Sequence, residues 1–309
     1  MSGTAVPSPS GRTLALAIDI GGTKVALGLV TDDGELVASA RFATPRGAPA
    51  SAAQAVLEQA SAFAAEARVV AAGIVLPAVV EEGVLAWAAE SIDGWQGLSL
   101  RALAEQALHV PTVVEFDGYG ATLGEAWRGH ARGYPDALIV IVGTGVGAGI
   151  MHGGRLYRGR TAIAGGIGWI RFPGGDGLGP KLEEVAAGPG ILAAARALRP
   201  DASYADTEAV FASAAAGDET AASVVEHAMQ VLSAGVGAVV AALAPDIVVL
   251  GGSVGARPDV VASVRRLLPQ VTQPFAAAGT RVEGSALGPL SSLYGAARFA
   301  HLFAQGKEP

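Results

Sequence analysis

Asp19-Ile20-Gly21-Gly22-Thr23-Lys24 joins two apolar runs, residues 14–18 and 25–30, near the start of the chain. β-prone runs joined by Gly-Gly are typical of a tight hairpin. Glycine lets backbone N–H groups approach an anion closely, and Thr23 and Lys24 add a hydroxyl and a cation. Asp19, at the end of the first strand, is suited to hold a hydrated Mg²⁺. The alternative is an ordinary hairpin with an exposed Asp and Lys.

Composition limits the possible functions. The 309 residues are enough for one large domain or two medium ones. Hydrophobic residues make up 51% of the chain and aromatic residues only 6%, which favours closely packed helices with small side chains. The net charge of −7 argues against a nucleic-acid partner, because binding to phosphates requires a basic face. The absence of cysteine excludes disulfides, thiolate nucleophiles and cysteine-ligated zinc.

Neither the N-terminal residues nor the most apolar region of the chain indicates a signal peptide or a membrane span. Residues 1–13 lack an apolar core of signal-peptide length and are predicted to be a disordered tail. The most apolar region, residues 224–250, is interrupted by Ala244-Pro245-Asp246 and has helical periodicity in its first part. We therefore expect a cytoplasmic protein without a membrane span.

Strands and helices alternate along the chain after an opening group of three strands. A helix is predicted over 50–68, a strand over 69–75, a helix over 98–108 and a strand over 112–115. A short hairpin is expected around residues 82–83, and the glycine-rich residues 165–180 are expected to be a loop. This order predicts an α/β sheet with helices on its faces.

Two further strands run into glycine-rich turns. The predicted strand 137–142 leads into Gly143–Gly149, and the strand 247–250 ends in Gly251-Gly252-Ser253. The repetition predicts two related halves, each contributing a phosphate-binding hairpin. Asp117 stands between the strand 112–115 and a predicted helix over 119–128. An Asp at this position is either a functional carboxylate or a helix N-cap.

In this order and spacing, the motifs resemble the ROK family (repressor, open reading frame, kinase) over residues 14–304. The resemblance implies the two-lobed, ribonuclease-H-like α/β fold of sugar kinases, actin and Hsp70, with an interdomain cleft. A small lobe would comprise residues 14–118 with a closing helix at 290–304, and a large lobe residues 119–289. It also implies a homodimer, ATP and Mg²⁺ as cofactors, and a small-molecule sugar substrate.

The resemblance assigns roles to individual residues. Asp117 would be the catalytic base, and Asp19 would hold Mg²⁺ through water. The residues that would bind ATP and its phosphates are Asp19, Gly21, Gly22, Thr23, Lys24, Gly143, Thr144, Gly145, Gly147, Gly251, Gly252 and Ser253. The sugar that receives the phosphoryl group is the acceptor. The residues that would contact it are Ser91, Trp95, Phe116, Gly166, Trp169 and Glu183.

The acceptor positions depart from the pattern of ROK glucokinases. Phe116 and Ser91 stand where those enzymes usually have Asn, and Gly166 and Trp169 replace a Glu and a His that hold sugar hydroxyls. Glu183 matches the family's sugar-binding Glu, although a solvated helix Glu is the alternative. The cysteine-bearing zinc loop is absent, so no zinc site is expected.

These departures predict a changed acceptor. Loss of polar groups from a sugar pocket removes the hydrogen bonds that select a fully hydroxylated ring. We therefore expect ATP-dependent phosphorylation of a hydroxymethyl group on a C7-cyclitol or an amino sugar such as kanosamine, within carbohydrate metabolism that serves antibiotic biosynthesis. The alternatives are an ordinary hexose kinase, acting on glucose or N-acetylmannosamine, and a non-catalytic sugar or nucleotide sensor.

Overall fold

The predicted Gly-Gly hairpin opens the first of two compact units in the computed structural model, which describes residues 12–174, 177–202 and 204–309. Unit 1 consists of Met1–Arg132, Arg155–Ile163 and Leu290–Pro309, and unit 2 of Gly133–Gly154 and Ala164–Pro289. The predicted disordered tail, residues 1–13, lies outside the described residues except for its last two. The α/β class and the two-lobed organisation are confirmed.

The sheet of unit 1 has the order β3-β2-β1-β4-β7. Its strands are β1 (Leu14–Ile20), β2 (Lys24–Thr31), β3 (Leu36–Ala43), β4 (Val69–Leu76) and β7 (Thr112–Phe116). The first three pair antiparallel, and β4 and β7 run parallel to β1. Because β1 has neighbours on both edges and helices on both faces, residues 14–18 are all buried, which explains their continuous apolar run. The predicted short hairpin is β5 (Ala78–Glu81) with β6 (Val84–Ala88).

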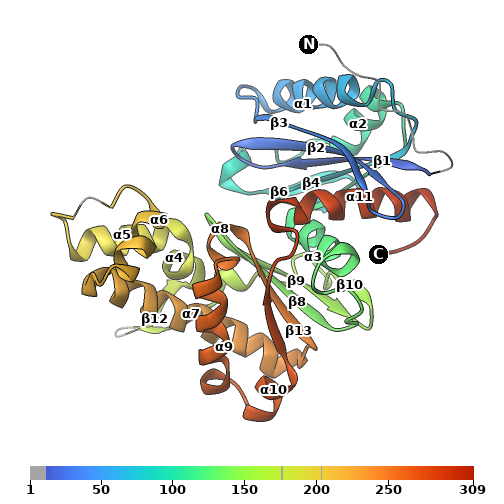
Figure 1. The fold of residues 1–309 in the computed structure, drawn as a ribbon. Coiled ribbons are helices and arrows are strands. Elements are labelled where there is room, and N and C mark those ends of the chain that lie inside the picture. The colour runs from blue at the N-terminus through green and yellow to red at the C-terminus, as the bar shows by residue number, and fades with distance from the viewer. Residues whose placement is uncertain (1–11, 175–176, 203) are drawn as a thin grey trace. The chain divides into compact units, whose positions relative to one another are not determined.

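Helices cover both faces of this sheet (Figure 1). Helices α1 (Pro49–Ala64) and α2 (Leu100–Leu108) cover one face, and α3 (Asp117–Arg128) and α11 (Ser291–Ala304) cover the other. Helix α11 packs against the backbone of both α3 and β4: a Cβ at Gly295 would lie 1.7 Å from the Gly120 carbonyl oxygen, and a Cβ at Gly73 in β4 would lie 1.9 Å from that of Ala296. The predicted close packing of small residues is therefore confirmed here.

The second sheet repeats the topology of the first, with the order β10-β9-β8-β13-β14. Its strands are β8 (Ala137–Val142), β9 (Val146–His152), β10 (Arg155–Tyr157), β13 (Ile247–Gly251) and β14 (Arg281–Gly284). Strands β8 and β9 form the antiparallel hairpin, and β13 and β14 run parallel to β8. The prediction of two related halves is confirmed.

The remaining helices belong to unit 2. They are α4 (Leu182–Ala186), α5 (Gly188–Leu198), α6 (Thr207–Ala215), α7 (Glu219–Leu243), α8 (Gly252–Gly255), α9 (Pro258–Val271) and α10 (Pro274–Gly279). Helix α7 begins after Asp218, whose carboxylate accepts hydrogen bonds from the N–H groups of Thr220 and Ala221. By length and composition α7 is apolar enough to cross a membrane, but half of its most apolar window is buried in the unit, as in a core helix.

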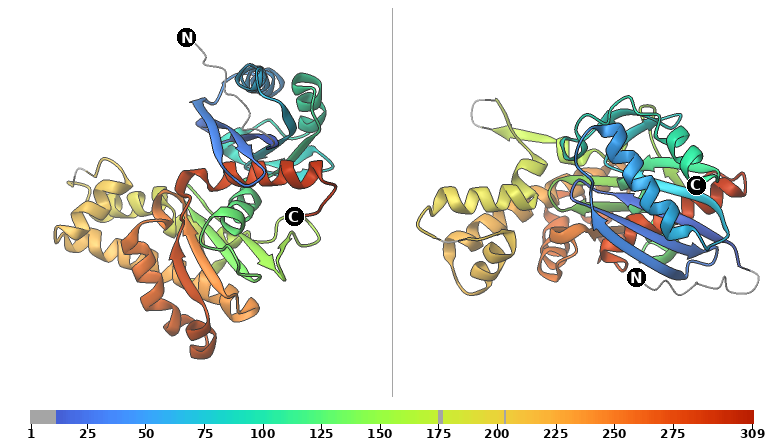
Figure 2. Two further views of the ribbon diagram at one scale, coloured as in Figure 1. Left: turned by 45° about the vertical axis from the view of Figure 1, so that its right-hand side comes forward. Right: turned by 90° about the horizontal axis from the view of Figure 1, so that it is seen from above.

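Two expectations differ from the structure. Residues 165–180 are not only loop: they contain the 3₁₀ turn η2 (Ile167–Trp169) and the strands β11 (Arg171–Gly174) and β12 (Gly177–Lys181), which pair as a hairpin that projects from unit 2 (Figure 2). The sequence placed residues 119–289 in one lobe, whereas α3 and Arg155–Ile163 belong to unit 1. Helix α3 joins unit 1 because its glycines allow α11 to pack against its backbone.

Candidate active site

The first glycine turn is closed by a hydrogen bond from the Gly21 N–H to the Lys24 carbonyl oxygen at 3.0 Å. The Thr44 hydroxyl fixes the turn from outside by donating to the Gly21 carbonyl oxygen at 2.6 Å. Gly22 has no positive φ, but a Cβ there would lie 2.5 Å from the Cβ of Ser91. Glycine is therefore required at position 22 by the close approach of the 3₁₀ turn η1 (Glu90–Ile92). Thr23 and Lys24 are exposed beside it.

Two carboxyl groups lie at strand ends in the sheet of unit 1. Asp19 is near the end of β1, and Asp117 directly follows β7, with β4 between the two strands. The pKa of Asp19 is raised to about 7, chiefly by burial and also by the charge of Asp117, while Arg41 opposes the shift. Burial also raises the pKa of Asp117 to about 6, opposed by the backbone N–H groups of Gly118 and of Asp117 itself. The negative charge of Asp117 thus acts on Asp19, so a cation beside Asp19 would be stabilised.

Asp117 is the first residue of α3 and not its N-cap, which is Phe116. The carboxylate still benefits from the free N–H groups of the first helical turn. The Phe116 ring meets Tyr119 edge-on, with 5.3 Å between ring centroids. A Cβ at Gly118 would lie 2.4 Å from the Phe116 ring, so glycine is needed for that ring to pack against the first turn of α3.

The two other acceptor candidates of unit 1 differ in exposure. Ser91 is exposed and packs against the first glycine turn. Trp95 is only 4% exposed and lies in the hydrophobic core of unit 1. The indole of Trp95 thus helps to fill this core, and its contact with the acceptor stays a prediction.

The second and third glycine turns meet in unit 2. Gly143 and Gly145 close the β8–β9 turn with an N–H···O hydrogen bond of 3.0 Å. Gly252 has a φ of +82°, and a Cβ there would lie 2.3 Å from the Val142 carbonyl oxygen. A Cβ at Gly143 would lie 3.7 Å from the Ser253 hydroxyl oxygen. The turn after β13 is thus pressed against the turn after β8, which places both at the carboxyl ends of parallel strands. Gly147 lies within β9, and Gly251 ends β13.

A pocket of about 400 Å³ in unit 2 joins Gly143, Thr144 and Ser253 to the starts of α5 and α6. The rest of its lining is formed by Gly188, Pro189, Leu192, Asp206, Thr207, Glu208, Phe211, Val254 and Arg257. The Arg257 guanidinium lies over the Phe211 ring, 4.1 Å from its centroid. Asp259, at 2.9 Å, and Glu208 hold the guanidinium in place by ion pairs. A flat apolar wall beside glycine N–H groups is suited to a nucleoside with attached phosphates.

The sequence did not single out Phe211, Glu208 or Arg257. Only Arg257 lies near a predicted site residue in the sequence, one helical turn after Ser253. Glu208 and Phe211 lie on α6, far from the glycine turns in sequence. Their approach to the glycine turns depends on how α6 and α9 pack, which no local pattern reports.

The acceptor candidates of unit 2 gather around η2. Trp169 is 63% exposed, and the Lys181 ammonium lies 3.5 Å from the centroid of its indole. Lys181 also lies 3.8 Å from the Glu183 carboxylate. The Glu183 carboxylate approaches the Val146 N–H at 3.5 Å, and a Cβ at Gly168 would lie 3.1 Å from it. Glu183 therefore faces the β8–β9 turn and is not a freely solvated helix residue. Gly166 lies directly before η2.

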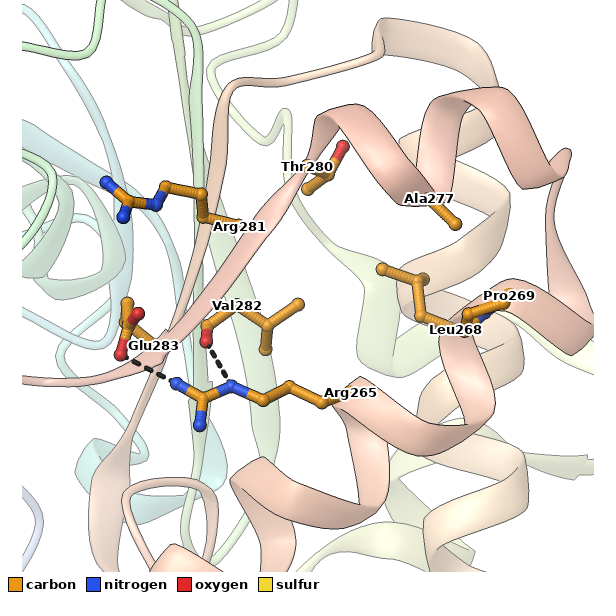
Figure 3. A pocket seen from close by; sticks show the side chains of 8 residues that line it. All are labelled: Arg265, Leu268, Pro269, Ala277, Thr280, Arg281, Val282 and Glu283. Carbon is orange, nitrogen blue, oxygen red and sulfur yellow. Dashed lines mark hydrogen bonds and ion pairs between the residues drawn. The ribbon is translucent and has the colours of Figure 1, made fainter.

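A second hollow of unit 2, of about 440 Å³, lies between α9, α10 and β14 (Figure 3). The Arg265 guanidinium donates to the Val282 carbonyl oxygen and pairs with Glu283, both at 2.7 Å. The lining of this hollow contains none of the predicted site residues. Among the described residues, no group of three or more His, Asp or Glu side chains is arranged to hold a metal.

Comparisons with known proteins agree with these motifs. The model of the ROK family matches residues 15–302. An N-acetylmannosamine kinase from Citrobacter koseri is 33% identical over 264 residues, which is 82% of this chain and 88% of that protein. A ROK hexokinase from Thermus thermophilus has a TM-score of 0.83 at 29% identity and covers 95% of this chain and 100% of its own. A ROK glucokinase from Streptomyces griseus, in complex with glucose and AMPPNP, has a TM-score of 0.76 at 28% identity, covering 93% and 99%.

Proposed function

This chain belongs to the ROK family and is an ATP-dependent sugar kinase, and from that premise we propose which residues and which acceptor it uses. We propose that Asp117 takes the proton of an acceptor hydroxymethyl group as that oxygen attacks the γ-phosphate of ATP. We further propose that the acceptor is a neutral, sugar-like ring that is differently configured or bulkier than glucose on the side of Gly166 and Trp169, such as a C7-cyclitol.

The raised pKa of Asp117, about 6, supports its role as the base. A general base is most effective when its pKa lies close to the working pH, because it is then ionised and still accepts a proton readily. The N–H groups at the start of α3 hold the carboxylate at one place.

The glycine turns and the neighbouring carboxylate supply the other requirements of phosphoryl transfer, which are position and charge neutralisation. Backbone N–H groups of Gly21–Thr23 and Gly143–Gly147 would hold the phosphates, and the pocket beside Phe211 would hold the nucleoside. Asp19 would hold Mg²⁺ through water. Mg²⁺ would neutralise the charge on the phosphate oxygens, and its presence beside Asp19 fits a carboxyl group whose pKa is raised by burial and by a second negative charge.

The surroundings of Trp169 carry the proposal for the acceptor. An indole that is 63% exposed offers a flat apolar surface to a sugar or cyclitol ring, where glucokinases of the family have a hydrogen-bonding His. Gly166 adds no side chain at the position of the family's Glu. Glu183 remains, but the Lys181 ammonium at 3.8 Å already accompanies its charge. A cationic amino sugar such as kanosamine would meet this ammonium, so a neutral ring is favoured over it.

N-acetylmannosamine is the second candidate. It is also neutral, and the named activity of curated relatives near 33% identity favours it. Its N-acetyl methyl group would suit an apolar surface such as that of Trp169.

The test measures ADP release from Mg·ATP with four acceptors: valiolone, which is a C7-cyclitol, N-acetylmannosamine, kanosamine and glucose. Each is measured for the wild type and for Asp117→Asn. We expect valiolone to give the highest kcat/KM and Asp117→Asn to lower kcat at least about 100-fold. N-acetylmannosamine as the best substrate would establish the second candidate, and glucose as the best substrate would overturn the role given to Gly166 and Trp169. Binding of ATP with no turnover of any acceptor would instead indicate a sensor.

A further inference from the structure

Arg158 is held on three sides within unit 1. Its guanidinium forms an ion pair with Glu115 at 2.7 Å. It also lies over two aromatic rings, 5.9 Å from the centroid of Tyr119 and 5.8 Å from that of Phe299. These distances are within the range of cation–π attraction. The backbone carbonyl oxygen of Arg158 accepts a hydrogen bond of 3.2 Å from the Tyr119 hydroxyl.

Two of these partners bracket Asp117 in sequence. Glu115 precedes it by two residues in β7, and Tyr119 follows it by two residues in α3. Arg158 lies some 40 residues away in sequence, in the segment Arg155–Ile163. One side chain from a distant segment therefore holds the chain on both sides of the candidate base.

The environment of this contact distinguishes it from an ordinary surface ion pair. The side chains of Arg158 and Glu115 are 31% and 19% exposed, and Tyr119 is 1% exposed. Exposed ion pairs contribute little to stability because solvent screens them and both side chains lose freedom. A planar guanidinium that pairs with a carboxylate and lies over two rings has little freedom left to lose.

We propose that Arg158 is a positioning residue for the phosphoryl transfer: by holding Glu115 and Tyr119, it keeps the Asp117 carboxylate at the place where it meets the acceptor hydroxyl. This inference rests on the proposed role of Asp117 as the base. A misplacement of about 1 Å at a reacting group is enough to lower a rate about 100-fold.

The experiment compares Arg158→Met and Arg158→Lys with Arg160→Met as the matched control. Arg160 is an exposed arginine of the same segment. The readout is ADP release from Mg·ATP with whichever of the four acceptors named above the wild type turns over fastest, or slow hydrolysis of Mg·ATP if none is turned over. We expect Arg158→Met to lower kcat about tenfold to 100-fold with the KM for ATP unchanged. Arg158→Lys should recover part of kcat, because it keeps the charge beside Glu115 but loses the planar contact with the rings.

A double variant separates positioning from general loosening of the fold. If Arg158 acts through Asp117, Arg158→Met should have no further effect on the residual rate of Asp117→Asn. Full additivity of the two substitutions would overturn the proposal, and so would a wild-type kcat in Arg158→Met. Wild-type activity of Asp117→Asn would overturn the role of Asp117 itself, which is a different result from failure of the Arg158 contact.

Discussion

Gly22→Ala tests whether the first glycine turn is held by its contact with η1. The new Cβ would lie 2.5 Å from the Ser91 Cβ and 3.0 Å from the Ser91 carbonyl oxygen. Carbon atoms in ordinary contact are about 3.5–4.0 Å apart, so the turn or η1 must move by about 1 Å. The φ of Gly22 is not positive, and the backbone itself therefore accepts alanine.

This displacement should affect both stability and activity. Forcing one additional carbon into a close contact costs about 1–3 kcal/mol of unfolding free energy. The same movement would shift the N–H groups proposed to hold the ATP phosphates, and we expect kcat/KM for ATP to fall about 100-fold. Urea unfolding gives the first quantity, and initial rates of ADP release at varied Mg·ATP give the second.

Two control variants make the result specific. Gly279→Ala adds a Cβ with no atom within 4 Å and should change neither quantity. Ser91→Gly removes one of the clashing atoms, so it should restore part of the stability and activity when combined with Gly22→Ala. Wild-type behaviour of Gly22→Ala, or no recovery in the double variant, would refute the reasoning from this contact.

Four further predictions concern the site residues. In the wild type, kcat/KM should rise with pH and level off above the pKa of Asp117, about 6, and Asp117→Asn should lower kcat at least about 100-fold across that range. Because the pKa of Asp117 is raised from 3.8, its ionisation destabilises the folded state, so the unfolding free energy of the wild type should fall between pH 4 and pH 7. Urea unfolding should show Asp117→Asn to be more stable than the wild type by about 1–3 kcal/mol at pH 8 and equally stable near pH 4. The same pH dependence of unfolding in both proteins would contradict this. Arg257→Met removes the cation over Phe211 and should raise the KM for ATP about threefold to tenfold with the KM for the acceptor unchanged, as initial rates at varied ATP would reveal. Trp169→Ala should raise the KM for the acceptor without lowering the thermal unfolding temperature, since the indole is largely exposed; an unchanged KM would remove Trp169 from the acceptor site.

Much of the fold could be predicted because its signals are local. The Gly-Gly hairpin, the alternation of strands and helices, and the repeated glycine turns are each specified by residues within one turn or one strand. The carboxylates Asp19 and Asp117 could be placed at strand ends for the same reason. Exposure could not be predicted: Trp95 and Trp169 each follow a glycine, yet one is 4% and the other 63% exposed. Burial of a side chain depends on which distant elements pack on it.

The sequence by itself determined the two-lobed α/β class, the positions of the three glycine turns and the family, because strand pairing in hairpins and chain order follow from neighbouring residues. Only the tertiary structure decided which groups meet: Arg158 with Glu115, Arg257 with Phe211, and Ser91 with Gly22. It also decided that the charge of Asp117 helps to raise the pKa of Asp19, about 100 residues away in sequence, since electrostatic interaction depends on distance in space and on burial, not on separation along the chain.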